Sequence, residues 1–266
     1  MSPTLPVYFI SHGGGPWAFM DDDYGAAYAR LGEALAAIPA ELLDPPSAVL
    51  VVSGHWEEPE LAVTAHSAPP LLYDYYGFPR HTYDVTYPAP GEPALARRVQ
   101  ALLERAGFAA RLDAERGYDH GTFVPLSVMY PQADVPVIQL SLHASLDPAA
   151  HLLIGAALAP LRDEGVLILG SGMSYHNLRL MGPGAATPSR LFDAWLDETL
   201  AAPPSERCRR LVRWLEAPAA RVAHPREEHL LPLHVAAGAA GVDAASLIYH
   251  EDDFLGTMAV SSYRFG

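Results

Sequence analysis

The sequence of 266 residues contains no lysine and only one cysteine, and both shortages exclude classes of protein. Its 31 acidic residues outnumber 17 basic ones, so the net charge is −14 with histidine neutral. A chain of this charge repels phosphate, and we expect no nucleic-acid partner. Cys208 has no second cysteine to pair with, and the amino terminus lacks a basic region followed by an apolar run. Together these features predict a cytoplasmic protein.

Long hydrophobic runs are also missing. No stretch reaches the roughly 20 apolar residues that cross a bilayer, because glycine, proline or histidine interrupts each candidate. We therefore expect no membrane span. The chain is nevertheless 50% hydrophobic, which is enough to bury a sizeable core. The sequence shows no internal repeat and no linker, so we expect a single catalytic domain over residues 1–266.

Short apolar runs rich in β-branched residues alternate with stretches of helical spacing. The runs predict buried strands at 7–10, 48–52, 135–142, 166–169 and 246–249. The stretches between them predict helices at 24–38, 93–106, 148–161, 188–201 and 206–215. This order predicts an α/β domain with a central mixed, mostly parallel sheet and helices on both faces.

The segment from Ala68 to Gly91 is dense in tyrosine, proline and glycine and follows neither periodicity. We expect an ordered surface loop over residues 68–91. In compact domains, loops of this length are usually functional or disordered. Both a lid over a site and a contact between subunits are compatible with its composition.

Three of the twelve histidines follow predicted strands: His12, His55 and His176. Each lies among glycines and serines, which permit tight turns. Because ligands of open α/β sheets bind at the carboxyl ends of the strands, these side chains are candidates for one site. Neutral imidazoles bind Fe(II) and Zn(II), so the pattern favours a metal centre, although any single histidine could be a satisfied buried polar group.

Other motifs carry weaker signals. The cluster HPREEHLLPLH at 224–234 predicts a helix that begins at Pro225, and its histidines lack the i, i+4 spacing of zinc proteases. Asp119 and His120 are candidates for substrate binding or for support of a metal ligand, with helix capping as the alternative for Asp119. The glycines at 13–15 match no nucleotide-binding loop. Cys208 has no histidine beside it and is expected to carry no chemistry.

Six blocks, taken in order, resemble the class III extradiol ring-cleavage dioxygenases, closest to the 4,5-DOPA dioxygenase branch. They are SHGGGP, SGHWE, GYDHGTFVPL, VPVIQLSL, GSGMSYHNLR and HPREEHLLPLHVAAGAAG, and they extend from about residue 7 to the carboxyl terminus. The resemblance implies metal ligands at His12, His55 and His229. It also implies catalytic histidines at His176, as acid and base, and His120, with Asp119 and Tyr175 assigned to substrate binding.

The identity of the third metal ligand stays open at this point. Other members of the family use two histidines and a glutamate, so Glu228 is an alternative to His229, although the block EHLLPLHVA is most similar to the all-histidine branch. The resemblance further implies Fe(II) for activity, with Zn(II) able to occupy the same site. The implied substrates are a small aromatic diol, DOPA-like, and O₂. Arg80 and Arg179 are candidates to meet a substrate carboxylate, and a monomer or a homodimer is expected.

Two alternative functions belong to other classes of protein. In a zinc-dependent hydrolase of an amide or ester, His176 or Glu228 would activate a metal-bound water. In a metal-free binding module on the same fold, the histidines would hold no ion. Activity without oxygen would favour the first, and loss of the ligand residues would favour the second.

Overall fold

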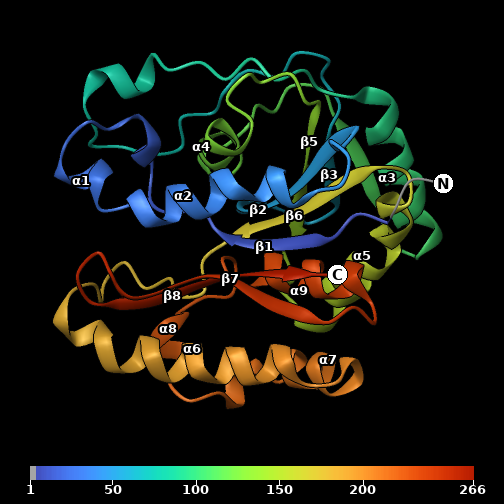
Figure 1. The fold of residues 1–266 in the computed structure, drawn as a ribbon. Helices are drawn as coiled ribbons and strands as arrows, with labels where there is room; N and C mark the ends of the chain where they lie inside the picture. Colours follow the sequence, from blue (N-terminus) through green and yellow to red (C-terminus); the bar gives the residue numbers. More distant parts are fainter. Residues whose placement is uncertain (1–3) are drawn as a thin grey trace.

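The computed structural model describes residues 4–266, which form one sheet of eight strands with helices on both sides (Figure 1). The strand order is β4-β3-β5-β2-β6-β1-β8-β7. The strands are β1 (Val7–Ser11), β2 (Ala48–Glu58), β3 (Leu61–Thr64), β4 (Ala110–Asp113), β5 (Val137–His143), β6 (Val166–Gly172), β7 (Ala245–Phe254) and β8 (Met258–Phe265).

The middle of the sheet is parallel. Strands β5, β2, β6 and β1 run in the same direction, whereas β8 pairs antiparallel with both β1 and β7, and β3 pairs antiparallel with β5. The predicted mixed, mostly parallel sheet of an α/β domain is thus confirmed. Its parallel centre is buried on both faces, which explains the uninterrupted apolar runs of β1, β2 and β6.

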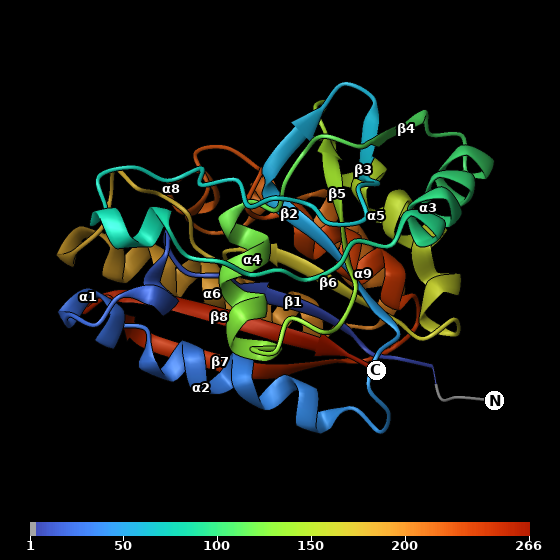
Figure 2. The same cartoon turned by 90° about the horizontal axis from the view of Figure 1, so that it is seen from above.

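Helices cover the sheet in two layers (Figures 1 and 2). Helices α2 and α4 pack together on one face of the sheet, and α5 and α9 lie on the other face. Helix α6 packs against β7 and β8, and α7 packs against α6. The helices are α1 (Asp23–Ala26), α2 (Ala29–Ala37), α3 (Pro93–Arg105), α4 (His120–Met129), α5 (Pro148–Leu158), α6 (Ala186–Ala201), α7 (Pro204–Val212), α8 (Ala220–Ala223) and α9 (Leu231–Ala240).

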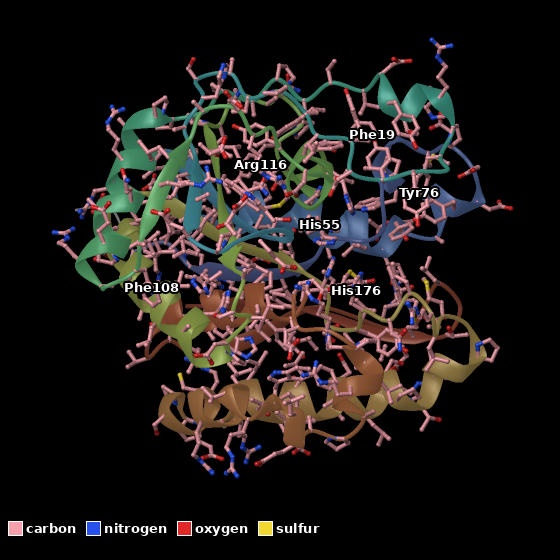
Figure 3. All side chains as sticks on the ribbon, turned by 180° about the vertical axis from the view of Figure 1, so that it is seen from behind. Phe19, His55, Tyr76, Phe108, Arg116 and His176 are labelled. Atoms are coloured by element: carbon pink, nitrogen blue, oxygen red, sulfur yellow. The ribbon has the colours of Figure 1, made fainter. Side chains whose placement is uncertain are left out.

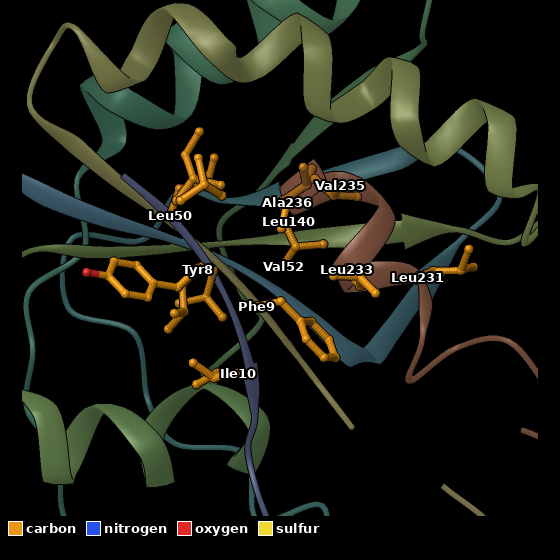
Figure 4. Close-up of a cluster of buried hydrophobic side chains, with 14 of the residues drawn as sticks. Tyr8, Phe9, Ile10, Leu50, Val52, Leu140, Leu231, Leu233, Val235 and Ala236 are labelled. Atoms are coloured by element: carbon orange, nitrogen blue, oxygen red, sulfur yellow. The ribbon is translucent and has the colours of Figure 1, made fainter. Parts of the chain in front are cut away.

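Helix α9 fills the space between the sheet and α5. It is apolar on every side, and nearly all of its residues are buried, as expected for a helix enclosed by other elements. Figure 4 shows its Leu231, Leu233 and Val235 near the apolar side chains of β1 and β2. Gly155 of α5 lets the two helices touch, because a Cβ there would lie 2.0 Å from the Val235 carbonyl oxygen.

Several predicted boundaries were wrong. The helix expected to begin at Pro225 begins at Leu231, and residues 224–230 form turns. Pro232 lies in the first turn of α9, where its missing N–H costs least, so it marks the true start better than Pro225 does. The helix expected over 24–38 is two helices, α1 and α2, and β2 continues six residues beyond its predicted end.

Some elements had no predicted counterpart, namely β3, β4, β8, α4 and the short α8. Helix α4 is buried all round and contains Pro125, so it shows neither helical amphipathicity nor a helix-forming composition. None of the helices described over residues 4–266 is both long enough and apolar enough for a membrane span.

The segment 68–91 is an ordered loop held by aromatic contacts. The ring centroids of Tyr73 and Phe123 lie 6.2 Å apart, and those of Phe78 and Tyr24 lie 5.6 Å apart. A 3-10 turn at Arg80–Tyr83 is its only helical part, and Leu71 forms an isolated bridge with Tyr118. The loop therefore crosses the molecule beside α4 and returns to the sheet edge.

Candidate active site

Three histidines converge at the carboxyl ends of neighbouring parallel strands. His12 directly follows β1, His55 lies on β2 beyond the irregularity after Val52, and His176 follows β6 by four residues. Since β2, β6 and β1 are adjacent in the sheet, their carboxyl ends share one edge. Figure 3 labels His55 and His176 in this part of the molecule.

Two further histidines arrive from elements that sequence patterns did not place. His229 lies in the turn before α9, and its carbonyl accepts a hydrogen bond from the Met173 N–H at 3.0 Å. Gly172 permits this approach, because a Cβ there would lie 2.1 Å from the same oxygen. His120 is the first residue of α4, and its ring centroid lies 4.1 Å from that of His55.

The ring nitrogens of three of these histidines point at one another. The Nε2 atom of His55 lies 3.2 Å from Nε2 of His12 and 3.2 Å from Nε2 of His229. Nitrogens that bind one zinc-like ion at about 2.0–2.1 Å are separated by roughly this distance. The two distances from His55 therefore fit ligands of a shared metal ion.

Hydrogen bonds on the other side of each ring fix which nitrogen carries the proton. Ser171 donates its single hydroxyl hydrogen to the Gly121 carbonyl, so at 2.9 Å it accepts from Nδ1 of His12. Nδ1 of His229 lies 3.1 Å from a Glu228 carboxylate oxygen. These acceptors hold the proton on Nδ1 and leave an Nε2 lone pair on each ring.

His55 follows the same rule through Asp74, whose Oδ2 atom lies 3.5 Å from His55 Nδ1. Burial, and then the neighbouring His120, lower the pKa of His55 to about 3, and burial holds the pKa values of His12 and His229 well below the usual range. Three neutral rings thus direct lone pairs at one point. A cation there would remove their mutual repulsion, so the donor set fits a divalent metal.

Two groups of side chains have potential ligand atoms within 4.8 Å of one another. One is His12, His55 and His120, and the other is His176, Glu228 and His229. In the second group, Nδ1 of His176 and Nδ1 of His229 both face Oε1 of Glu228, at 3.3 Å and 3.1 Å. Glu228 therefore lies behind His229, on the side of the ring away from Nε2.

Asp74 also belongs to this site, although no sequence pattern predicts it. Its Oδ1 atom accepts hydrogen bonds from the backbone N–H of His120 at 2.9 Å and from His120 Nδ1 at 2.8 Å, while Oδ2 faces His55. Burial alone would raise the pKa of Asp74, but the bonds from His120 lower it to about 2. One carboxylate in the 68–91 loop thus orients two imidazoles.

His176 lies flat against His229, with ring centroids 3.4 Å apart and an interplanar angle of 16°. The backbone N–H of His176 donates to the Ala223 carbonyl at 3.0 Å, which fixes the loop after β6. With Nδ1 directed at Glu228, the Nε2 lone pair of His176 is left for a group in the adjoining cavity.

Asp119 lies behind this cavity, not in its wall. Its side chain makes none of the capping hydrogen bonds that the alternative interpretation required, although its backbone occupies the N-cap position of α4. It is fully buried and accepts from Ser53 at 2.8 Å, from Arg116 at 3.2 Å and from Gln139. Asp119 therefore supports the strand ends, and direct contact with a substrate is not expected of it.

A cavity of about 490 Å³ opens beside the histidines. His12, His55, His120, His176 and His229 all line it, as do Asp74 and Tyr175. The Tyr175 hydroxyl donates to the Leu180 carbonyl at 2.9 Å, so its ring forms the wall. Such an enclosed space next to a set of neutral imidazoles can hold a small molecule against a metal ion.

An α/β domain with buried imidazole donors at the carboxyl edge of its sheet and a cavity beside them defines a histidine-centred enzyme. The family model described as the catalytic LigB subunit of aromatic ring-opening dioxygenase matches residues 6–266. The chain belongs to this family. It is an extradiol aromatic ring-opening dioxygenase, and the resemblance noted in its sequence is confirmed.

Similarity to individual relatives supports membership of this family. The chain is 42% identical to the 4,5-DOPA dioxygenase extradiol of Portulaca grandiflora, over 97% of this chain and 94% of that protein. It is 43% identical to the protein of the same name from Beta vulgaris, over 83% of each chain. The crystal structure of an uncharacterized protein from Escherichia coli K12 matches with a TM-score of 0.77 and 32% identity, over 98% of this chain and 99% of that one.

The family decides between the alternatives left open by the sequence. A ring-opening dioxygenase is an enzyme that consumes O₂, so the metal-free binding module and the zinc hydrolase are not kept. The metal, the substrate and the role of each residue are matters for proposal.

Proposed function

We propose that this protein cleaves the ring of a catechol-type, DOPA-like substrate with O₂ at one divalent metal held by His12, His55 and His229. The observation that carries the proposal is the convergence of three Nε2 lone pairs, with 3.2 Å between His55 and each of the other two. Three ligands on one side leave room for further molecules at the metal. The names of the relatives supply the DOPA-like substrate.

The metal is Fe(II) in this proposal, because a redox-active ion would pass electrons from the catechol to O₂. Zn(II) binds the same donors tightly and can replace it, which would leave the enzyme inactive. Glu228 is not proposed as a ligand, since its carboxylate faces Nδ1 of His229.

In this proposal, residues of the chain would accept and return the hydroxyl proton of the catechol. His176 would take a hydroxyl proton of the catechol at Nε2 and return it later, with Nδ1 held by Glu228. His120, fixed by Asp74 through Nδ1, would present its Nε2 atom to the substrate in the cavity. The Tyr175 ring would form the part of the cavity wall that contacts the substrate ring. The 68–91 loop, which contributes Asp74 to the site, would exclude water.

The test is reconstitution without oxygen. The purified protein is loaded with Fe(II) or Zn(II), mixed with DOPA or plain catechol and then exposed to air, while O₂ uptake and absorbance of the ring-opened product are followed. We expect stoichiometric uptake with Fe(II) only. Absence of uptake and product from protein with confirmed stoichiometric iron would contradict the proposal. A cytoplasmic location, with a monomer or a homodimer, belongs to the same proposal.

A further inference from the structure

The turn after β1 contains three glycines, Gly13, Gly14 and Gly15, and all three line the cavity beside the histidines. Gly13 and Gly15 are buried and have φ values of +80° and +52°, in the left-handed region that favours glycine. Within residues 4–266, the backbone N–H groups of these two glycines donate to no acceptor. In folded proteins, more than about 90% of buried backbone N–H groups are hydrogen-bonded. Two unpaired donors in a cavity wall therefore indicate a ligand that accepts hydrogen bonds.

Two side chains hold the peptide groups of this turn in place. The Trp17 indole N–H donates to the His12 carbonyl at 2.8 Å, and the Tyr24 hydroxyl donates to the Gly14 carbonyl at 2.8 Å. Both peptides are trans, so the N–H that follows each carbonyl points the opposite way. The Gly13 N–H thus points away from the buried indole. The orientation of both donors is fixed before any ligand binds.

No cation lines the cavity to receive a negatively charged substituent. The chain has no lysine, and within residues 4–266 no arginine belongs to the lining. Arg80 and Arg179, which the sequence offered as partners for a substrate carboxylate, are exposed and lie outside it. The Tyr24, Tyr75 and Tyr175 hydroxyls in the wall each donate to a backbone carbonyl. An anion in this cavity would therefore depend mainly on backbone N–H groups.

We propose that the N–H groups of Gly13 and Gly15 bind the carboxylate on the ring substituent of the substrate. This inference rests on the proposed ring-cleaving function and names the part of the chain that recognises the substituent. A cavity of about 490 Å³ has room for a catechol ring and its side chain. Backbone N–H groups close together in a turn form anion-binding sites, and a charged acceptor makes their hydrogen bonds about twice as strong. The turn can thus bind a carboxylate without an arginine.

Two catechols of the same length and shape test the proposal. 3-(3,4-Dihydroxyphenyl)propanoate has a carboxylate, and 3-(3,4-dihydroxyphenyl)propanamide is uncharged. Binding to the zinc-loaded protein is measured by calorimetry without oxygen, and kcat/KM of the iron-loaded protein is measured by O₂ uptake. We expect the carboxylate to be favoured by about tenfold in both measurements. Equal or tighter binding of the amide would overturn the inference.

Tyr24→Phe tests the turn itself, because it removes the hydroxyl that holds the Gly14 carbonyl. The preference for the carboxylate should fall by about fivefold through a higher KM, while kcat for the amide stays the same. Tyr76→Phe is the matched control and should keep the preference, since it removes a tyrosine hydroxyl from the same lining that makes no hydrogen bond to the turn. A preference that is unchanged in Tyr24→Phe, or lost in Tyr76→Phe, would overturn the inference.

Arg80→Ala and Arg179→Ala distinguish backbone from side-chain recognition. Both variants should keep the preference, and its loss in either would assign the carboxylate to that arginine and overturn the inference. The two proposals also fail separately. If the carboxylate binds preferentially but neither compound is cleaved, the ring-cleaving function fails and the recognition by the glycine turn stands. If both compounds bind and are cleaved equally well, the ring-cleaving function stands and the inference fails.

Discussion

Two sets of histidines in this molecule have pKa values lowered by burial, and they differ in what surrounds their ring nitrogens. His12, His55 and His229 lie at the sheet edge, and His151 and His224 lie among the packed helices. Burial lowers the pKa of His151 to about 4 and that of His224 to about 3, as it lowers that of His55. A neutral, buried ring is therefore common to both sets.

The difference lies in what the ring nitrogens face. Nδ1 of His151 donates to the Asp147 carbonyl at 2.7 Å, and its Nε2 accepts from the His143 N–H at 3.2 Å. Nε2 of His224 donates to the Ser174 carbonyl at 3.0 Å. At the sheet edge, by contrast, each Nε2 faces another Nε2. Lone pairs that converge, more than burial or a low pKa, distinguish a metal ligand from a structural histidine.

The largest effect is expected when one of the three converging histidines is removed. His55→Ala should abolish stoichiometric metal binding, because His55 is the central ring of the three. His151→Gln is the matched control and should keep its full metal content. Metal is measured by elemental analysis after reconstitution with Fe(II) or Zn(II). Equal metal content in the two variants would refute the assignment of the site.

His176→Ala separates metal binding from proton transfer. His176 stacks on His229 but directs its Nδ1 atom at Glu228, so the variant should keep its metal. Turnover should fall by roughly 10²–10⁴-fold, the usual contribution of a general acid or base. Metal content and kcat are measured on the same preparation. A variant that keeps normal turnover would disprove the acid and base role.

Asp74→Asn tests whether the loop carboxylate orients the histidines. The amide keeps the shape but loses the charge and one acceptor oxygen, so His120 and His55 should be held less firmly. Loss of such a supporting partner typically costs about 10–100-fold in metal affinity or activity. Competition with a chelator measures affinity, and oxygen uptake measures activity. Asp84→Asn, in the same loop but outside the cavity lining, is the control and should change neither.

The effect expected from the structural set is on stability in acid and not on metal binding or turnover. The pKa of His151 is about 4 in the folded protein and near 6.5 when unfolded. Its contribution is complete above pH 6.5 and is lost as the pH falls toward 4, because only the unfolded chain takes up the proton. The total is on the order of 3 kcal/mol.

His151→Gln lacks this titration. Its free energy of unfolding should therefore fall less steeply between pH 6.5 and 4 than that of the unchanged protein. Urea unfolding at a series of pH values gives the two curves, and contributions from the other histidines cancel in the difference. Curves of the same slope would show that His151 does not stay neutral in the fold.

The sequence predicted part of the site because of a general property of parallel sheets. His12, His55 and His176 follow apolar runs that become β1, β2 and β6, and parallel strands end at one edge. Local patterns could not place His229, because Pro225 signalled a helix that begins six residues later. Its assignment came from resemblance, and the close approach at Gly172 gives the physical reason.

Asp74 could not be predicted from the sequence for a different reason. The 68–91 loop has no periodicity, so nothing in it tells which side chain turns inward. The position of Asp119 behind Ser53 was likewise out of reach of the sequence, since it depends on how α4 meets β2. Distances between residues 46 or 174 positions apart in the chain, such as those from His120 to Asp74 and from His229 to His55, appear only after folding.

The amino-acid sequence alone was enough for the α/β class, the parallel centre of the sheet and the histidines at its edge. Those features follow from local hydrophobic periodicity and from chain direction, which neighbouring residues encode. The packing of distant segments was needed to bring His229 beside His55, to place Ser171, Asp74 and Glu228 against the ring nitrogens, and to form the cavity beside them. These depend on contacts between parts of the chain that no local pattern relates.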